Sequence, residues 1–316
     1  MLRELAARYG LGEVLAFRLA GTGIENANYF LTTAGDDGRQ RQHVLTLMLQ
    51  AANAGSAYEP MMRTLAAAGL PVAEPLPNLE GACVESYAGH SVLLQSCLPG
   101  RHTVNPTTRQ IESLARFTAR MHGTLHNPAV TLPAYPRDAA WLGTEAQTSA
   151  RELPYADAEL MRAAVTQVQS LLARGDTVGL PGGMIHGDLF RDNVLFNERG
   201  LTGVLDFHHA ATGYWLYDLA VIANDWCTDS SGALDGDRVT SLLRAYHGVR
   251  PLRPEEVWLF PVFALYAALA FWLSRLAVVL RPDETPSARS KDPNEFRRIV
   301  RAHTAHQFYL DPRLLG

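Results

Sequence analysis

The chain has 316 residues, of which 47% are hydrophobic, enough to bury one large core or two smaller ones. Its formal net charge of −4 gives no electrostatic basis for binding nucleic acid or an anionic membrane surface, so we expect neither as a partner. The 3 cysteines are widely spaced and form no Cys-x-x-Cys pair, which indicates reduced thiols and no structural zinc site.

Residues 1–98 are predicted to form a strand-rich lobe. The first ten residues carry interspersed charges without an apolar signal core, so we expect an amphipathic helix in a cytoplasmic protein. A helix from about Tyr58 to Ala68 ends at Gly69, a glycine C-cap followed by Pro71. Strand patterns bounded by Gly and Asp turns occur at residues 14–19, 28–32, 44–48, 83–87 and 91–95.

Two glycines, Gly21 and Gly23, lie between the first two predicted strands and precede Asn28. Glycines let backbone N–H groups approach an anion closely, and Asn28 could add a side-chain donor. A two-glycine turn between strands is more often only a hairpin. Its importance therefore depends on the motifs that follow in the chain.

After residues 96–100, where we place a hinge, the pattern becomes helical, which predicts a second lobe over residues 99–316. One helix is predicted to begin at Pro106 with Asn105 as its cap, and another to run from its cap Asp157 to Ala173. Further helices are expected near residues 215–227 and 235–248.

Residues 257–274 are free of charged side chains and roughly long enough to span a bilayer. Pro261, Arg275 and the absence of a basic cluster on either flank argue against a membrane span. We therefore expect a buried pair of helices in a soluble protein.

The motif His186-Gly187-Asp188 is followed by Asn193, five positions after the aspartate, and then by Asp206. A short apolar strand, Met184-Ile185, precedes the motif. Residues 193–197 and 202–205 flank Glu198-Arg199-Gly200, which predicts a hairpin with Asn193 at its entrance and Asp206 at its exit. Both side chains can then face one metal site. The alternatives are a hairpin whose Asp and Asn only cap turns, or a retained fold with an inactive site.

This arrangement is typical of phosphoryl transfer in the protein-kinase superfamily. One carboxylate accepts the proton of the attacking hydroxyl, while an amide and a second carboxylate hold magnesium on the ATP phosphates. We therefore predict Asp188 as the catalytic base, Asn193 and Asp206 as Mg²⁺ ligands, and ATP as co-substrate. The predicted fold is α+β and protein-kinase-like, with a small β-rich N-lobe and a larger, mostly α-helical C-lobe.

The phosphate-anchoring lysine expected on the third strand is missing, because Thr46 stands at that position and Lys291 is the chain's single lysine. Magnesium, loop amides and an arginine would then meet the phosphate charge. Thr46 suggests a nucleotide-binding pseudokinase as an alternative, but the joint presence of the three catalytic-loop and metal residues argues against it. The predicted nucleotide-binding residues are Gly21, Gly23, Asn28, Thr46, Ser96 and Leu98.

The chain resembles the type II homoserine kinases of the aminoglycoside-phosphotransferase and choline-kinase group over nearly its whole length. Residues 23–30 (Gly-Ile-Glu-Asn-Ala-Asn-Tyr-Phe) resemble the family's Gly-Ile-Glu-Asn-x-Asn-Tyr-Phe loop, and residues 186–196 resemble its catalytic loop. Further similar segments are residues 94–101, 217–220, 224–227, 271–276 and 292–296. The resemblance implies ATP:L-homoserine phosphotransferase activity in threonine biosynthesis.

A zwitterionic substrate needs an acid, a base and an apolar wall. Asp225 could hold its ammonium and Arg275 its carboxylate. Trp226 or Trp272 could form the wall, and His186 is assigned to the same site. The alternative is that the Asp and Arg form structural ion pairs and the tryptophans belong to the core.

Two further expectations concern the catalytic loop and the acceptor. Asp218 is predicted to fix the loop by hydrogen bonds, and His208 and His209 to flank the site without ligating metal. Because Asp229, Asp235 and Asp237 make the late segment acidic, an aminoglycoside or an amino alcohol such as choline or ethanolamine is an alternative acceptor.

Overall fold

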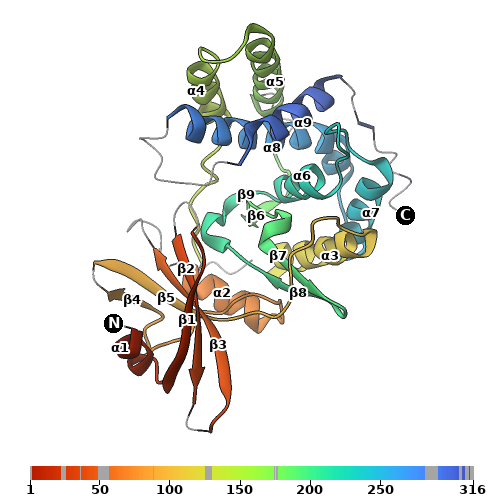
Figure 1. The fold of residues 1–316 in the computed structure, drawn as a ribbon. Coiled ribbons are helices and arrows are strands. Elements are labelled where there is room, and N and C mark those ends of the chain that lie inside the picture. Colours follow the sequence, from red (N-terminus) through yellow and green to blue (C-terminus); the bar gives the residue numbers. More distant parts are fainter. Residues whose placement is uncertain are drawn as a thin grey trace.

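The computed structural model describes residues 2–22, 26–35, 37–48, 57–87, 89–124, 130–173, 175, 177–281, 291–305, 308–309 and 313. A small lobe built on a sheet lies below a larger helical lobe in Figure 1. The sheet is antiparallel with five strands in the order β1-β2-β3-β5-β4. Its strands are β1 (Glu13–Thr22), β2 (Asn26–Ala34), β3 (Gln40–Met48), β4 (Val84–Tyr87) and β5 (His90–Ser96).

The two faces of this sheet pack against different helices because side chains alternate along a strand. Val92 and Leu94 on β5 join the apolar cluster formed with α1 (Leu2–Arg8). Leu93 between them joins the large core together with the buried face of α2 (Tyr58–Ala67). The helix predicted from Tyr58 is therefore confirmed, and Gly69 beyond its end has a φ of +71°.

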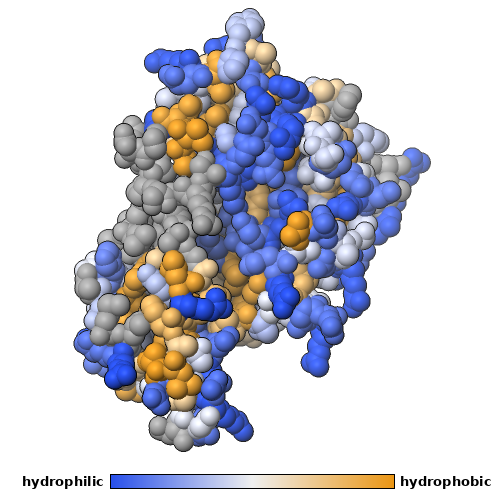
Figure 2. Space-filling model, viewed as in Figure 1, coloured by the Kyte–Doolittle hydropathy of each residue, from blue (hydrophilic) through white to orange (hydrophobic). Residues whose placement is uncertain are grey.

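The outer edge of the sheet carries exposed apolar side chains. Figure 2 shows apolar surface over the small lobe, in the region where β1 lies in the same view in Figure 1. Leu15, Phe17 and Leu19 occupy alternate positions of this edge strand and remain exposed. The Phe17 ring stacks on Tyr29 of β2 with a centroid distance of 4.7 Å, so part of this face is covered by the neighbouring strand.

The large lobe is mostly helical and contains two short antiparallel ribbons. One ribbon pairs β6 (Gly182–Ile185) with β9 (Ala211–Tyr214), and the other is the hairpin of β7 (Val194–Asn197) and β8 (Gly200–Val204). The helices are α3 (Thr108–Thr124), α4 (Ala139–Ser149), α5 (Tyr155–Ala173), α6 (Trp215–Trp226), α7 (Gly236–His247), α8 (Pro254–Leu280) and α9 (Pro293–Ala305).

The hairpin connects the two lobes through main-chain hydrogen bonds. The N–H of Val204 donates to the carbonyl of Pro71 at 2.9 Å, after α2. Arg101, just beyond the expected hinge, exchanges two hydrogen bonds with Phe196, at 2.8 and 2.9 Å. Strand β8 therefore contacts the small lobe directly, while its far end leads to Asp206.

The α+β, two-lobed fold class is confirmed, but several helix boundaries differ from the prediction. Helix α3 begins at Thr108, because Thr107 rather than Asn105 caps it: the Thr107 hydroxyl accepts from the N–H of Gln110, and the Gln110 side chain accepts from the N–H of Thr107. Helix α5 begins at Tyr155, so Asp157 lies in its first turn and does not cap it.

The expected pair of helices around residues 257–274 is one continuous helix, α8, with Pro261 inside it. By length and hydropathy α8 could cross a membrane, yet most of its apolar stretch is buried inside the protein. It packs against α4, α5, α6 and α9, so it is the central helix of the large lobe. A helix that is apolar all round requires such neighbours on every side.

Candidate active site

The catalytic loop begins where β6 ends at Ile185, and its second residue must be a glycine. Gly187 has a φ of +77°, a conformation that costs other residues steric strain. A Cβ at this position would also lie 3.4 Å from the carbonyl of His209 and 3.4 Å from the ring of Tyr135. The motif therefore combines a left-handed turn with close packing, which places Asp188 beside the segments that carry Tyr135 and His209.

Asp188 and Asn193 face each other across the loop. The Asn193 Nδ2 donates to Asp188 Oδ2 at 2.9 Å and to the Asp188 carbonyl at 2.8 Å. Burial raises the pKa of the Asp188 carboxyl; the nearby His209 opposes this shift and the Asp206 carboxylate adds to it. Asp188 and Asp206 thus lie close enough to repel each other, as expected for two acids that share one reaction centre.

Asp206 follows β8 in a left-handed conformation, with φ 60° and ψ 58°. Among the described residues no other non-glycine residue has a positive φ. Aspartate tolerates this region better than most residues, and such backbone strain is concentrated at functional sites. The Asp206 side chain is exposed, so its carboxylate is accessible from solvent.

Hydrogen bonds through Leu205 hold the end of the hairpin that leads to Asp206 against the catalytic loop. The N–H of Leu205 donates to the Asn193 carbonyl at 2.8 Å, and the Leu205 carbonyl lies 2.9 Å from Nε2 of His186. His186 Nδ1 accepts from the N–H of Asp188 at 3.2 Å, so the neutral ring carries its proton on Nε2 and donates it to Leu205. The fully buried His186 is therefore a connector between the two segments.

Asp218 on α6 fixes the start of the loop, as predicted. Its two carboxylate oxygens accept the N–H groups of His186 and Gly187, both at 2.8 Å. A third donor, Nε2 of His122 on α3, lies 3.0 Å away. Burial lowers the pKa of His122, and the hydrogen bond to Asp218 partly opposes this shift. These bonds satisfy a carboxylate that has no contact with solvent.

Asn28 and Thr46 are opposite each other on β2 and β3, where other kinases place the anchoring lysine. The Thr46 hydroxyl donates to Asn28 Oδ1 at 2.7 Å. Gly21 on β1 pairs with Asn28, so these three residues lie side by side across the sheet. Gly23 lies outside the described residues.

Helix α2 contacts the segment that follows Asp206 through an aromatic pair that the sequence did not single out. Tyr58 stacks on His208 with a centroid distance of 4.8 Å and an interplanar angle of 6°. The Tyr58 hydroxyl accepts from Nε2 of Gln95 at 3.3 Å. Glu59, the acid at the start of the same helix, pairs instead with Arg63 at the surface. Helix α2 therefore contacts the segment after Asp206 through Tyr58, while its first acid, Glu59, is paired at the surface.

The two predicted hinge residues have different surroundings. Ser96 ends β5 and is exposed. Leu98 lies against the hairpin: a Cβ on Gly203 would come within 2.8 Å of its Cδ1 and 3.2 Å of Cδ1 of Leu195. Leu98, near the expected hinge, and Leu195 of β7 thus both lie against Gly203 of β8.

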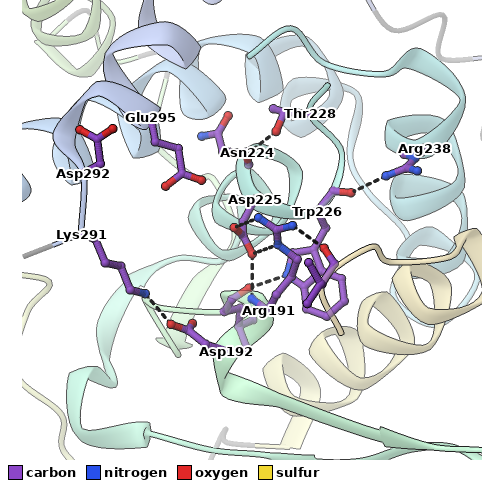
Figure 3. Close-up of polar contacts among 12 residues, drawn as sticks. Arg191, Asp192, Asn224, Asp225, Trp226, Thr228, Arg238, Lys291, Asp292 and Glu295 are labelled. Carbon is purple, nitrogen blue, oxygen red and sulfur yellow. Dashed lines mark hydrogen bonds and ion pairs between the residues drawn. The ribbon is translucent and has the colours of Figure 1, made fainter. Parts of the chain in front are cut away.

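Asp225 is bound by an arginine of the catalytic loop (Figure 3). Its Oδ2 accepts from the backbone N of Arg191 at 2.7 Å and from Nε at 3.1 Å, and its Oδ1 accepts from Nη2 at 3.1 Å. Burial raises the pKa of Asp225, and the bonds from Arg191 oppose that shift. The structure thus places Asp225 in an ion pair with Arg191, the alternative that the sequence also offered, and its contact with a substrate ammonium stays a prediction.

The other residues expected to contact substrate are also engaged elsewhere. Trp226 and Trp272 are 0% and 1% exposed, and Nε1 of Trp226 donates to the Leu189 carbonyl at 2.9 Å. Arg275 pairs with Glu295 at 2.6 Å and lies over the Phe296 ring at 4.4 Å. Both tryptophans lie in the core, as in the alternative offered from the sequence, and Arg275 joins α8 to α9, so their contacts with substrate stay predictions.

Arg137 is a cation beside the catalytic loop that the sequence did not single out. Its guanidinium lies 4.9 Å from the centroid of the Phe271 ring. Burial alone would lower its pKa, but Tyr135, Tyr217 and the Asp188 carboxylate raise it, so the charge is retained. Arg137 directly precedes Asp138, the N-cap of α4, and this capping signal is the only local pattern that marks the segment.

Comparisons with known proteins agree with this geometry. The model of the family described as "Phosphotransferase enzyme family" matches residues 16–252. The homoserine kinase of Cupriavidus pinatubonensis is 36% identical over 94% of this chain and 91% of its own, and that of Cupriavidus necator is 37% identical over 93% and 90%. A crystal structure of spectinomycin phosphotransferase matches with a TM-score of 0.71 at 12% identity, covering 96% of both chains.

The family match covers most of the chain and includes both the small-lobe sheet and the catalytic hairpin. The relatives are similar in sequence over both lobes, and the solved structure shares the fold. By these criteria the chain belongs to the phosphotransferase enzyme family.

Proposed function

We propose that the protein is a homoserine kinase, which transfers the γ-phosphoryl group of ATP to the primary hydroxyl of L-homoserine and releases O-phospho-L-homoserine and ADP. The observation that carries the phosphotransferase assignment is the hydrogen-bonded pair of Asp188 and Asn193 with Asp206 beside it. The acceptor follows from the homoserine kinases to which the chain is similar along nearly its whole length. The proposed setting is threonine biosynthesis in the cytoplasm.

Asp188 accepts the proton of the acceptor hydroxyl. Asn193 holds its Oδ2 in place, which leaves Oδ1 to receive the hydroxyl hydrogen. The bonds from Leu205 and Asp218 fix the backbone on both sides, so the base is preorganised for attack. Burial that raises the pKa of Asp188 also makes it a better proton acceptor than a free aspartate.

The residues at the hairpin fit a magnesium ion brought with ATP. Because Asn193 directs its Nδ2 toward Asp188, its Oδ1 points away and is available as a ligand, and Asp206 offers an exposed carboxylate. Within the described ranges no group of three or more His, Cys, Asp or Glu side chains could form a separate metal cage. Few protein ligands and several water or phosphate ligands are typical of Mg²⁺. When bound, the ion would neutralise charge on the phosphates.

For nucleotide binding we propose that Asn28 makes part of the phosphate contact that the missing lysine would make. Its Oδ1 is occupied by the Thr46 hydroxyl, so its Nδ2 group is left to donate to a phosphate oxygen. Gly21 with its neighbours would cover the phosphates, and Ser96 and Leu98 would contact the base at the boundary between the proposed lobes 1–98 and 99–316. Gly23 is predicted to bind the nucleotide as part of the same loop.

A coupled assay of ADP formation over several acceptors tests the proposed function. L-Homoserine is compared with L-serine, choline, ethanolamine and kanamycin in the presence of Mg²⁺ and ATP. We expect the highest kcat/KM for L-homoserine. L-Serine has one methylene fewer, so its hydroxyl lies roughly 1 Å short of Asp188, a misplacement that can cost on the order of 10²-fold. A kcat/KM for choline, ethanolamine or kanamycin at or above that for L-homoserine would overturn the acceptor and leave the kinase assignment intact.

A further inference from the structure

The loop that carries Arg137 is held firmly against the large lobe. The N–H of Tyr135 donates to the Thr212 carbonyl at 2.9 Å. The Tyr266 hydroxyl donates to the Arg137 carbonyl at 2.5 Å. One residue later, the Asp138 side chain accepts the N–H of Trp141 and caps α4. The backbone of Arg137 is therefore fixed by contacts on three sides.

The Arg137 side chain lies close to the catalytic loop. It lies over the ring of Phe271. The Phe271 ring makes a T-shaped contact with Phe190 at a centroid distance of 4.6 Å, and Phe190 follows Asp188 by two residues in the catalytic loop. Tyr135, from the same loop as Arg137, packs against Gly187, the residue before Asp188. Two chains of contact thus join the Arg137 loop to residues near the catalytic base, one through Phe271 to Phe190 and one through Tyr135 to Gly187.

Arg137 differs from the other partly buried arginines of the large lobe. Arg191, Arg250, Arg275 and Arg281 each form an ion pair with a carboxylate. Within the described part of the chain, Arg137 has no carboxylate within ion-pair distance, and only the more distant charge of Asp188 and two tyrosine hydroxyls act on it. A partly desolvated cation without an acidic partner costs free energy, which an incoming anion would offset.

We propose that Arg137 binds the α-carboxylate of the amino-acid acceptor, so that the hydroxyl at the other end of the substrate meets Asp188. Guanidinium groups bind carboxylates through two parallel hydrogen bonds, which fix orientation as well as charge. Arg137 therefore takes the role that the sequence suggested for Arg275. This inference rests on the proposed homoserine kinase activity and extends it to the residue that selects amino acids over amino alcohols.

The competing role for Arg137 is contact with the transferring phosphoryl group, and kinetics separate the two. The α-carboxylate keeps its charge throughout the reaction, so losing its partner raises KM for the acceptor. A phosphoryl contact strengthens in the transition state, so losing it lowers kcat for every acceptor. The two roles predict different changes for a substrate without a carboxylate.

The test compares wild type, R137Q and R137K with L-homoserine and with 3-aminopropan-1-ol, which lacks only the carboxylate. For R137Q we expect KM for L-homoserine to rise on the order of 10- to 100-fold, the loss typical of a charge-assisted hydrogen bond. KM for ATP should change less than about twofold, and kcat/KM for 3-aminopropan-1-ol should stay within about threefold of wild type. R137K keeps a point charge without the planar fork, so its KM for L-homoserine should lie between the other two.

Arg281→Gln is the matched control, because it removes the same charge from an ion pair with Glu145 between α8 and α4. It should leave the ratio of the two acceptors unchanged. A fall in kcat of similar size for both acceptors in R137Q, or an unchanged KM for L-homoserine, would overturn the proposed carboxylate contact. If R137Q does not fold, R137K decides by the same KM comparison. If wild type fails to phosphorylate L-homoserine while it accepts 3-aminopropan-1-ol, the proposed function itself is wrong.

Discussion

Asn193 donates to the side chain of Asp188 at 2.9 Å and to its carbonyl at 2.8 Å, so the residue expected to bind metal also orients the expected base. One amide thereby serves two functions through its two ends. The nitrogen fixes the carboxylate that we propose as the proton acceptor, and the oxygen is left for the proposed cation. The spacing of five residues between Asp188 and Asn193 therefore brings the amide within hydrogen-bonding distance of the carboxylate.

Asp188→Asn should lower turnover by roughly 10²- to 10⁴-fold, because an amide cannot accept the hydroxyl proton. ATP affinity should remain close to wild type, since Asp188 is not assigned to the nucleotide. Steady-state kinetics together with calorimetric titration of Mg·ATP measure both quantities. Near wild-type turnover in a correctly folded variant would remove Asp188 from the role of base.

Asp206→Ala should abolish the dependence of ATP binding on Mg²⁺ as well as phosphoryl transfer, because it removes the exposed carboxylate of the proposed metal site. Titration of ATP with and without Mg²⁺ provides the measurement. Glu80→Ala, at an exposed position of the small lobe, serves as a control for loss of a surface charge. Unchanged affinity for Mg·ATP in Asp206→Ala would contradict the assignment.

Thr46→Val removes the hydroxyl that orients Asn28 and keeps the shape of the side chain. We expect kcat/KM for ATP to fall about fivefold, the value of one neutral hydrogen bond, far less than kinases lose with their lysine. Thr46→Ser, which keeps the hydroxyl, should stay near wild type. A loss in Thr46→Val as large as that in Asp188→Asn would show a direct catalytic part for Thr46.

Asp225→Asn should lower stability more than substrate binding. The change removes the charge that compensates Arg191, and breaking a largely buried pair costs about 2–4 kcal/mol. KM for L-homoserine should rise less than about twofold, whereas kcat falls because Arg191 belongs to the catalytic loop. Thermal unfolding and steady-state kinetics test this. A selective rise in KM for L-homoserine, with unchanged unfolding temperature, would restore Asp225 as an ammonium ligand.

His303 links stability to pH. Burial lowers the pKa of His303 to about 4, and its Nε2 lies 2.8 Å from Oδ1 of Asn224. Unfolded histidine has a pKa of about 6.5 and binds protons first, so stability is complete above that value and is lost as the pH falls toward 4. The loss should reach at most about 2 kcal/mol at pH 5. Denaturant unfolding of wild type and His303→Gln between pH 7.5 and 5 should show the steeper decline in wild type. Parallel declines would exclude His303 as the source.

The catalytic loop and its hairpin followed from the sequence alone. Asp188 and Asn193 lie on one tight loop, and Asp206 follows a short hairpin, so a few residues of local structure determine their distances. Helix α2 was predicted for the same reason, since glycine and proline end it locally. The start of α3 was misplaced because Asn105 and Thr107 are both good caps, and only the reciprocal bonds with Gln110 select Thr107.

Tertiary structure decided which partners the later residues take. Arg191 and Asp225 are 34 positions apart, Arg275 and Glu295 are 20 apart, and Arg137 reaches Phe271 from another loop. Each of these side chains has several partners of suitable charge or shape in the sequence, and the packing of α6, α8 and α9 in the large lobe selects one of them. The sequence by itself thus determined the chemistry of phosphoryl transfer, because that chemistry is encoded in short-range spacing. The surroundings of the two arginines are set by helix packing, so only the folded chain distinguishes the ion-paired Arg275 from Arg137, which we propose as the carboxylate ligand.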